Sequence, residues 1–196
     1  MSRLYLGRFS DVHIGGPSSN QATSLESQMI HPTQLLPGRT LRELNQDNNW
    51  RKLLGKDNQD RHQRDIELIL RLFSLFEEWN SYEKPMKEYL NNSMRLNVGF
   101  ASARAKRFER FFPIACKTVV ESLGEKPFHI RGPLNSSVLD ATMIAILENK
   151  GNASADLADR YRRLISHKAF EERTRTSTTD TITVRDRIRD AKKYLT

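Results

Sequence analysis

Hydrophobic and polar positions are most strongly patterned in the segment from Asp60 to Met94. Two neighbouring apolar rows run along its first half at helical spacing: Ile66, Ile69, Leu70, Phe73 and Phe76 in one, and Leu68, Leu72, Leu75 and Trp79 in the other. Two rows cover more of a helix than the one stripe of a surface helix, so they predict a central helix that is buried on most sides. Pro85 suits a first helical turn. The one-sided apolar stripe after it predicts a second helix, packed back on the first as a hairpin.

The central segment also carries a narrow set of charged residues: Arg61, Arg64, Asp65, Glu67 and Arg71. Glu67 and Arg71 stand four residues apart, in the order that favours an ion pair on a helix. Charged side chains that face inward from a buried helix must be paired to be tolerated. These five residues are therefore expected to form an internal ion-pair seam, and contact with a ligand is the alternative interpretation.

Capping signals outline the helices that follow one another along the chain. Thr40 begins a Thr-x-x-Glu capping box, which predicts that ordered structure starts there. Asp47 can cap the next helix, which Gly55 ends. Residues 98–123 keep helical spacing, and Pro113 either kinks one long helix or begins a second.

The C-terminal part contains further predicted helices. Asn135 and the two serines after it offer caps for one helix, and Asn152 can cap another. The Thr-rich stretch 174–183 favours local side-chain to backbone bonds over a continuous helix. The last helix is expected to start near Thr183. Its apolar positions form one seam: Val184, Ile188, Ala191 and Leu195.

The expected fold is therefore all-α, a bundle-like domain of about seven to nine helices over residues 40–196. Residues 1–39 are rich in Ser, Gly, Pro, Asn and Gln, which predicts an irregular arm. No apolar run reaches the roughly 18 residues of a membrane span. The N-terminus lacks the apolar core of a secretion signal, and the one cysteine, Cys116, cannot close an intramolecular disulfide. A cytoplasmic protein without a membrane span is expected.

The positive charge of the chain adds an expectation about its binding partners. The chain has a net charge of +8 and a sequence pI of about 9.8, which favours polyanionic partners. From Arg160 onward, eleven Lys and Arg accompany five Asp and Glu. We expect non-specific DNA binding around the last helix through five residues: Arg173, Arg175, Arg185, Arg189 and Lys192. A solvated basic face is the alternative. The Thr-rich stretch likewise suits either an anion site or a simple capping role.

Residue types with catalytic or metal-binding chemistry are scattered. No two histidines have the spacing of a helical zinc pair, and Cys116 lies in an apolar segment, where a thiol packs as a small hydrophobe. Asp140, Glu148 and Lys150 echo the acidic pair and lysine of magnesium nucleases, but both carboxylates fall on a predicted helix. The sequence therefore points to no catalytic residue, metal or cofactor.

Two separated segments resemble parts of a known family. The first contains Arg61, Arg64, Asp65, Glu67, Leu70 and Arg71, followed by Tyr82, Met86 and the stretch 90–94. The second contains Phe170, Thr174, Ser177, Thr178, Val184, Arg187, Ile188 and Ala191. Together they resemble the helical portion that follows the catalytic part of GmrSD-type bacterial restriction proteins, over the chain from Leu41 to its end.

The resemblance implies an upstream ParB/sulfiredoxin-like domain with an Asp-Gly-Gln-Gln-Arg type motif, associated with nucleotide hydrolysis and DNA cleavage. This chain has no such motif. It is therefore expected to be a scaffold or binding module of an anti-phage defence system, which contacts DNA, a separate catalytic subunit or a second copy of itself. The alternatives are an active DNA nuclease or NTPase with an unrecognised site, and a truncated remnant without activity.

Overall fold

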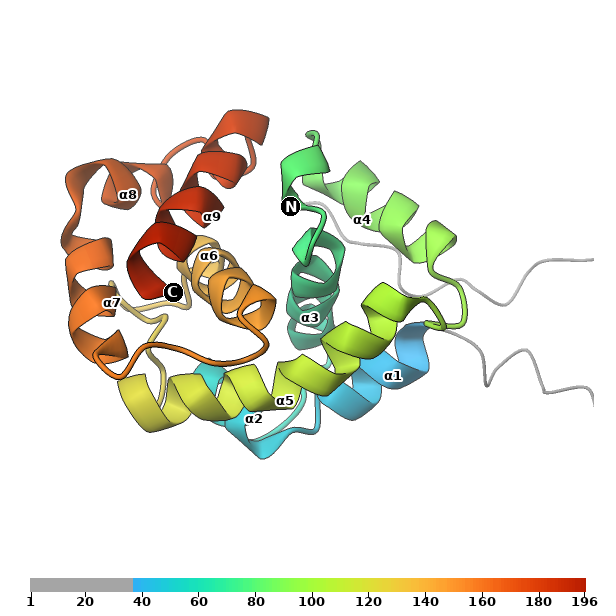
Figure 1. Ribbon diagram of the computed structural model, residues 1–196. Coiled ribbons are helices and arrows are strands. Elements are labelled where there is room, and N and C mark those ends of the chain that lie inside the picture. The colour runs from blue at the N-terminus through green and yellow to red at the C-terminus, as the bar shows by residue number, and fades with distance from the viewer. Residues whose placement is uncertain (1–36) are drawn as a thin grey trace, which may run out of the picture.

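The computed structural model describes residues 37–196, and the elements in this range are helices (Figure 1). In chain order they are α1 (Pro37–Leu44), α2 (Asn48–Leu54), α3 (Arg64–Leu75), the short 3-10 helix η3 (Trp79–Ser81), α4 (Met86–Leu96), α5 (Ala103–Leu123), α6 (Ser136–Glu148), α7 (Leu157–Ser166), α8 (Lys168–Arg173) and α9 (Thr181–Leu195). The predicted all-α class is confirmed over this range. The arm expected for residues 1–39 lies outside the described residues, apart from the three residues that open α1.

Helix α6 lies in the middle of the described molecule, with α3, α5 and α9 packed against it (Figure 1). Its side chains are buried continuously from Ser137 to Leu147. A helix that is buried all round belongs to a core rather than to a surface. Helix α3 is also largely buried, with Ile69, Leu72 and Leu75 fully enclosed. The predicted central helix is thus confirmed, and it shares the centre with α6.

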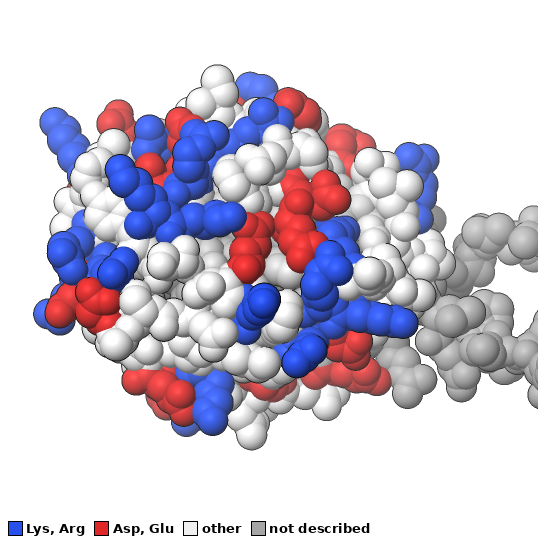
Figure 2. Space-filling view, in the orientation of Figure 1, with Lys and Arg blue, Asp and Glu red and all other residues white. Residues whose placement is uncertain are grey.

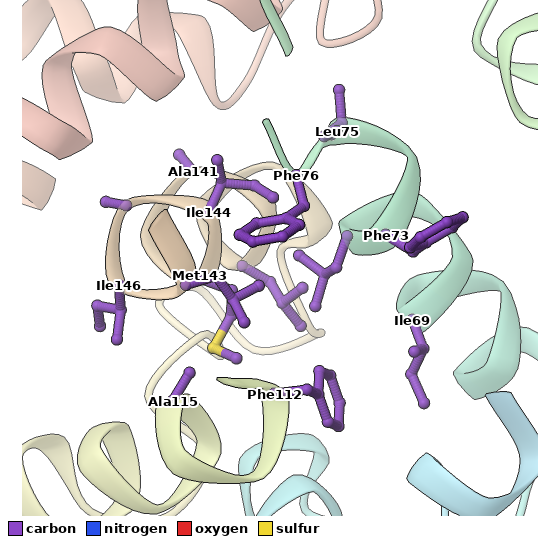
Figure 3. Close-up of a cluster of buried hydrophobic side chains, with 14 of the residues drawn as sticks. Ile69, Phe73, Leu75, Phe76, Phe112, Ala115, Ala141, Met143, Ile144 and Ile146 are labelled. Carbon is purple, nitrogen blue, oxygen red and sulfur yellow. The ribbon is translucent and has the colours of Figure 1, made fainter. Parts of the chain in front are cut away.

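Aromatic side chains join these helices in the core (Figure 3). The rings of Phe73 and Phe76, near the end of α3, lie 5.5 and 5.7 Å from the ring of Phe108 in α5, in edge-on and tilted arrangements. Aromatic rings prefer such arrangements to face-to-face stacking. Phe112 of α5 and Met143 of α6 are fully buried in the same cluster. Burying each of these side chains contributes about 1.5–3 kcal/mol relative to exposing it.

Several helix ends follow the local signals in the sequence. The carboxylate of Asp47 accepts a 2.8 Å hydrogen bond from the Trp50 amide at the start of α2. Gly55 closes α2 with a φ of 63°, a left-handed conformation that glycine adopts without strain. The Asn135 side chain accepts from the first amides of α6. These caps confirm the predicted starts of α2 and α6.

Other helix ends differ from the expectation. Helix α1 starts at Pro37, so Thr40 lies inside it instead of capping it, and proline suits the first turn. Helix α7 starts after Asp156 rather than at Asn152. Pro113 lies inside one helix, α5. The carbonyl that proline leaves without a donor belongs to the exposed Glu109, where water can satisfy it.

Helices α3 and α4 form the predicted hairpin, with η3 at the turn (Figure 1). Met86 and Leu90 bury one face of α4, and the Tyr89 hydroxyl donates a 2.6 Å hydrogen bond to the Ser74 carbonyl of α3. Burial raises the pKa of Tyr89 to about 12, so it stays a donor. Within residues 37–196, no helix combines the length and the apolar character needed to cross a membrane.

Candidate nucleic-acid interface

The structure brings the five basic residues predicted to bind DNA to the part of the molecule formed by α8 and α9. Arg173 ends α8, Arg175 lies in the following turn, and Arg185, Arg189 and Lys192 lie along α9. Figure 2 shows Lys and Arg side chains gathered over the region of α7, α8 and α9, with a second basic group over α5 and acidic side chains between them. The predicted apolar seam of α9 is confirmed, because its four members are fully buried: Val184, Ile188, Ala191 and Leu195.

Each of the five basic residues predicted to bind DNA forms an ion pair within the chain. Arg173 pairs with Asp190 at 2.5 Å and Asp186 at 3.6 Å, and Arg189 pairs with Asp186 at 2.5 Å. Arg175 pairs with Glu171 at 3.6 Å. The surface is therefore a set of alternating charges and not the bare basic row that the spacing suggested, because α9 places Asp186 and Asp190 next to its arginines.

Arg185 and Lys192 point toward neighbouring elements. Arg185 donates to the Tyr82 carbonyl at 2.9 Å and pairs with Glu83 at 2.7 Å, just after η3. Lys192 pairs with Glu148 of α6, and its ammonium group lies 5.4 Å from the centre of the Trp79 ring. Both contacts tie α9 to the rest of the bundle. These two residues are thus placed for a structural role as well as for a surface charge.

Some basic side chains of this surface are exposed enough to exchange a carboxylate partner for another anion. The side chains of Arg175 and Arg189 are 62% and 61% exposed. Exposed ion pairs contribute only about 0–1 kcal/mol, so a phosphate group can replace the carboxylate at small cost. Lys168 and Lys193 are also exposed, and neither has an acidic partner within 4 Å among the described residues.

Residues 174–180 of the Thr-rich stretch form the turn between α8 and α9, and its last three residues open α9. The hydroxyls of Thr174 and Thr176 donate to the carbonyls of Glu171 and Glu172 and so cap the end of α8. The carbonyl of Thr178 accepts from a buried arginine below it. These contacts match the capping alternative for this stretch, since Thr174 and Thr176 use their hydroxyls on carbonyls of α8.

That buried arginine is Arg187, which the sequence reasoning did not assign to a site. Its side chain is fully buried, and its Nη1 donates to the carbonyls of Arg173 and Thr178 at 3.3 and 3.1 Å. Its Nη2 lies 3.8 Å from the Oδ2 of Asp140 in α6. Burial lowers the pKa of Arg187 to about 10. A signal existed in the sequence, because position 187 falls within the apolar seam of α9.

Asp140 also binds Arg71 of α3, which corrects the expected partner of that arginine. Nε of Arg71 lies 3.4 Å from the Oδ1 of Asp140, and Nη2 donates to Oδ2. Burial opposes the charge of Arg71, but Asp140 outweighs burial and raises its pKa. Glu67, four residues away, is half-buried and outside ion-pair distance of Arg71. Because α3 is buried, its charged side chains meet partners on neighbouring helices.

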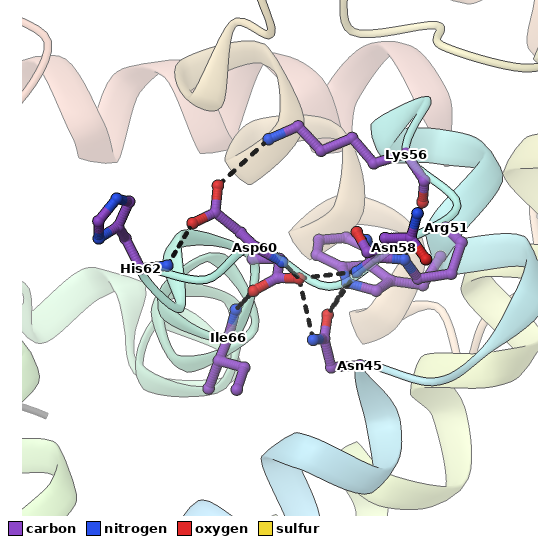
Figure 4. A network of polar contacts seen from close by, with 9 residues as sticks. Asn45, Arg51, Lys56, Asn58, Asp60, His62 and Ile66 are labelled. Carbon is purple, nitrogen blue, oxygen red and sulfur yellow. Dashed lines mark hydrogen bonds and ion pairs between the residues drawn. The ribbon is translucent and has the colours of Figure 1, made fainter.

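Asp65 belongs to a separate polar cluster near the start of α3, which Figure 4 shows around Asn45, Arg51 and Asp60. Its Oδ2 pairs with Arg51 of α2 at 2.8 Å and accepts from Asn45 at 3.0 Å. Arg61 and Arg64 are exposed at the entrance to α3. The expected five-residue seam is therefore not formed: Asp65 and Arg71 belong to two separate clusters, Glu67 makes no ion pair among the described residues, and the first two arginines lie at the surface.

The residues that echo a magnesium nuclease do not share an open site. Asp140 is fully buried between two arginines. Glu148 pairs with Lys192 and accepts from the Glu77 amide at 3.0 Å. In the part of the chain that the structure describes, no three His, Cys, Asp or Glu side chains are grouped to hold a metal ion. Cys116 is buried, and burial raises the pKa of its thiol well above the ordinary value.

Comparison with known proteins adds no relative to these observations. The chain matches no protein-family model, no curated protein and no solved structure. The resemblance to GmrSD-type proteins therefore stays a prediction that rests on the residues quoted for it.

Proposed function

We propose that the chain is a binding module without a catalytic site of its own, which contacts the phosphate backbone of nucleic acid through α8 and α9. The observation that supports this proposal is the distribution of charge. The segment from Arg160 onward, which includes most of α7 as well as α8 and α9, has an excess of six positive charges, one of them the buried Arg187, while the whole chain has a net charge of +8. Clustered positive charge is the electrostatic footprint of a phosphate-binding surface.

Exposure divides the basic residues of the proposed surface into two groups. Arg175, Arg189, Lys168 and Lys193 are exposed and either weakly paired or without an acidic partner in the described range. Arg173, Arg185 and Lys192 are less exposed and hold α8 and α9 in place. The first group supplies the charges that reach a phosphate, and the second group positions the surface.

A titration with labelled duplex DNA at two salt concentrations tests the proposal. The triple variant Arg175→Ala, Arg189→Ala, Lys193→Ala removes three exposed charges from the proposed surface. Since the logarithm of the binding constant falls with the logarithm of salt by about 0.9 per phosphate contact, the slope of the variant is expected to be shallower by roughly two to three. Its affinity at low salt is expected to fall by on the order of tenfold or more.

A matched control removes the same charge from another face. Lys106, Arg110 and Lys117 are exposed on α5, and their triple alanine variant carries the same net charge as the first variant. It is expected to keep the wild-type salt slope. Equal losses in both variants would mean that net charge alone attracts DNA, and no loss in either would place the contact elsewhere.

The resemblance to GmrSD-type proteins extends the proposal to a partner. A module of this kind would act beside a separate catalytic subunit, or as an assembly of copies, within an anti-phage system. Co-purification of the tagged chain with the product of an adjacent reading frame tests that extension. Recovery of the chain alone, at the mass of a monomer, would count against it.

A further inference from the structure

One edge of the Arg187 guanidinium group has no acceptor. Nη1 donates to two carbonyls, whereas Nε and Nη2 are buried and have no hydrogen-bond partner among the described residues. Nε and Nη2 together form the side edge of the group, where two N–H bonds point in parallel. This fork is the geometry with which arginine binds carboxylates and phosphates in a bidentate manner.

Two other arginines in this molecule use the same edge for a carboxylate. Nε and Nη2 of Arg107 donate to the two carboxylate oxygens of Glu77 at 2.8 and 2.5 Å. Nε and Nη2 of Arg71 donate to the two oxygens of Asp140. Both oxygens of Asp140 are thus used by Arg71. Nη2 of Arg187 lies 3.8 Å from the Oδ2 of Asp140, which is close enough for an ion pair but too far for a hydrogen bond.

The sum of the buried charges around Arg187 also favours an anion at its Nε–Nη2 edge. Arg71, Arg187 and Asp140 leave one positive charge in excess at this place in the interior. Glu67 attracts Arg71 but is not among the groups that act on Arg187. A buried charge without a full partner is strongly unfavourable, so one additional anion here would be stabilising.

The second buried arginine cluster shows what a balanced arrangement looks like in the same protein. Arg51 and Asp65 carry opposite charges and sum to zero. Every guanidinium nitrogen of Arg51 has an acceptor, supplied by Lys56, Asn45, Asp65 and Asn58. The Arg187 cluster differs in both respects, since within residues 37–196 it has an excess positive charge and two N–H donors without acceptors.

We propose that the Nε–Nη2 edge of Arg187 binds a small monovalent anion, such as chloride, nitrate or formate, in the interior between α3, α6 and α9. One negative charge balances the cluster, and a small ion suits a place that is closed to solvent. Nη1 is held by the carbonyls of Arg173, at the end of α8, and Thr178, in the following turn, so the Nε–Nη2 edge is the part of the group left for the ion. The site is separate from the exposed cations of the proposed nucleic-acid interface.

Thermal unfolding of the full chain at constant ionic strength tests this site. Sodium chloride, bromide, nitrate or formate replaces sodium gluconate, whose anion is too large for a closed site. An ion that binds the folded state alone raises the unfolding midpoint progressively once its concentration exceeds its dissociation constant. The expected result is such a rise with the small anions, and its loss in Arg187→Lys, which keeps the charge but lacks the fork.

Arg51→Lys is the matched control, because it changes a buried arginine of the balanced cluster. It is expected to lower the midpoint in every salt but to keep the rise with small anions. Crystals of the wild-type chain grown in sodium bromide give a direct readout that does not depend on any variant. An anomalous peak in contact with Nε and Nη2 of Arg187 is expected. The same midpoint in all salts, a rise that persists in Arg187→Lys, or no bromide at this edge would each overturn the proposal.

Discussion

Asp140 faces two buried guanidinium groups, so its loss is expected to be more damaging than the loss of Arg71. Asp140→Asn leaves Arg71 and Arg187 as two positive charges in the interior, whereas Arg71→Met leaves one arginine for one carboxylate. Removing one partner of a buried pair costs about 3–5 kcal/mol. In urea unfolding, we expect Asp140→Asn to lose at least this much free energy and Arg71→Met to lose less.

The variant Glu67→Gln is the control for the prediction that Asp140→Asn loses more stability than Arg71→Met. Glu67 is half-buried and makes no ion pair within 4 Å among residues 37–196, so its loss is expected to change stability by less than about 1 kcal/mol. Burial raises the pKa of its carboxyl, which makes the neutral variant easier to accommodate. Equal losses in Glu67→Gln and Arg71→Met would instead support the ion pair between neighbours on α3.

Asp65 couples folding to pH. Burial opposes its charge, but hydrogen bonds from the Asp60 amide, Arg51 and Asn45 outweigh burial and lower its pKa below the ordinary value of 3.8. The unfolded chain therefore takes up the proton first as the pH falls. The stabilisation is present above about pH 4 and is lost as the pH falls through the lowered pKa.

We therefore expect Asp65→Asn to be less stable than the wild type at neutral pH. Its unfolding free energy should also fall less steeply than that of the wild type between about pH 4 and pH 2. Urea unfolding at a series of pH values measures both effects, and Asp57→Asn, at an exposed position in the loop before α3, is the control. Identical acid slopes for Asp65→Asn and the wild type would contradict the role given to Asp65.

At the scale of helices, the sequence predicts what depends on near neighbours and misses what depends on distant ones. The caps at Asp47 and Asn135 act on amides within three residues, so a local pattern is sufficient to find them. The partner of Arg71 lies 69 residues away, and helical spacing carries no information about it. Helix α6 supplies that partner, because a helix buried on all sides brings Asp140 into the interior.

Helix α9 shows both a feature that spacing predicts, its apolar seam, and one that spacing misses, the buried Arg187. Its apolar seam follows from spacing alone, and all four predicted members are buried. Arg187 occupies the same stripe, and hydropathy gives no reason to place a guanidinium group in a core. An arginine at a position that belongs to an apolar seam is the signal that would have found it, since such a residue must have a partner when buried.

The Asp47 cap gives a prediction at the scale of one helix. Asp47→Ala removes the acceptor of the Trp50 amide and is expected to cost about 1 kcal/mol of stability, within the usual range of 0.5–2 kcal/mol. Asp57→Ala removes the same charge from an exposed loop position and should change stability little. Comparing the two urea midpoints checks the cap, and equal losses would show that the charge matters and the cap does not.

At the scale of the whole molecule, α9 connects the two proposals. Its outer side carries exposed cations such as Arg189, and its inner side carries Arg187 against α6 and α3. An anion at Arg187 would fix α9 and the turn before it, and the exposed basic residues are mounted on these same elements. Duplex affinity measured in gluconate and in chloride at equal ionic strength tests whether an anion at Arg187 influences duplex binding by the exposed basic residues. If the proposals are independent, affinity does not depend on which of the two anions is present.

The last prediction concerns chemistry by the chain itself. Metal-assisted cleavage of a phosphodiester needs carboxylates that converge on an accessible ion. Asp140 is enclosed by Arg71 and Arg187, and Glu148 is held by Lys192, so neither is presented in that way. We expect the purified chain neither to cleave DNA nor to hydrolyse GTP or ATP with magnesium or manganese present.

Supercoiled plasmid and radiolabelled nucleotides provide the assays, and the Glu148→Gln variant separates intrinsic activity from a contaminant. Glu148 is the better probe, since Asp140 variants are expected to lose several times more stability. Turnover that follows the protein through every purification step and disappears in Glu148→Gln would show that the chain is an enzyme. Turnover that is unchanged in Glu148→Gln and separates from the protein on ion exchange would be a contaminant's. Absence of turnover, together with salt-dependent duplex binding, is the combination that a binding module requires, because phosphate contacts need charge and no catalytic site.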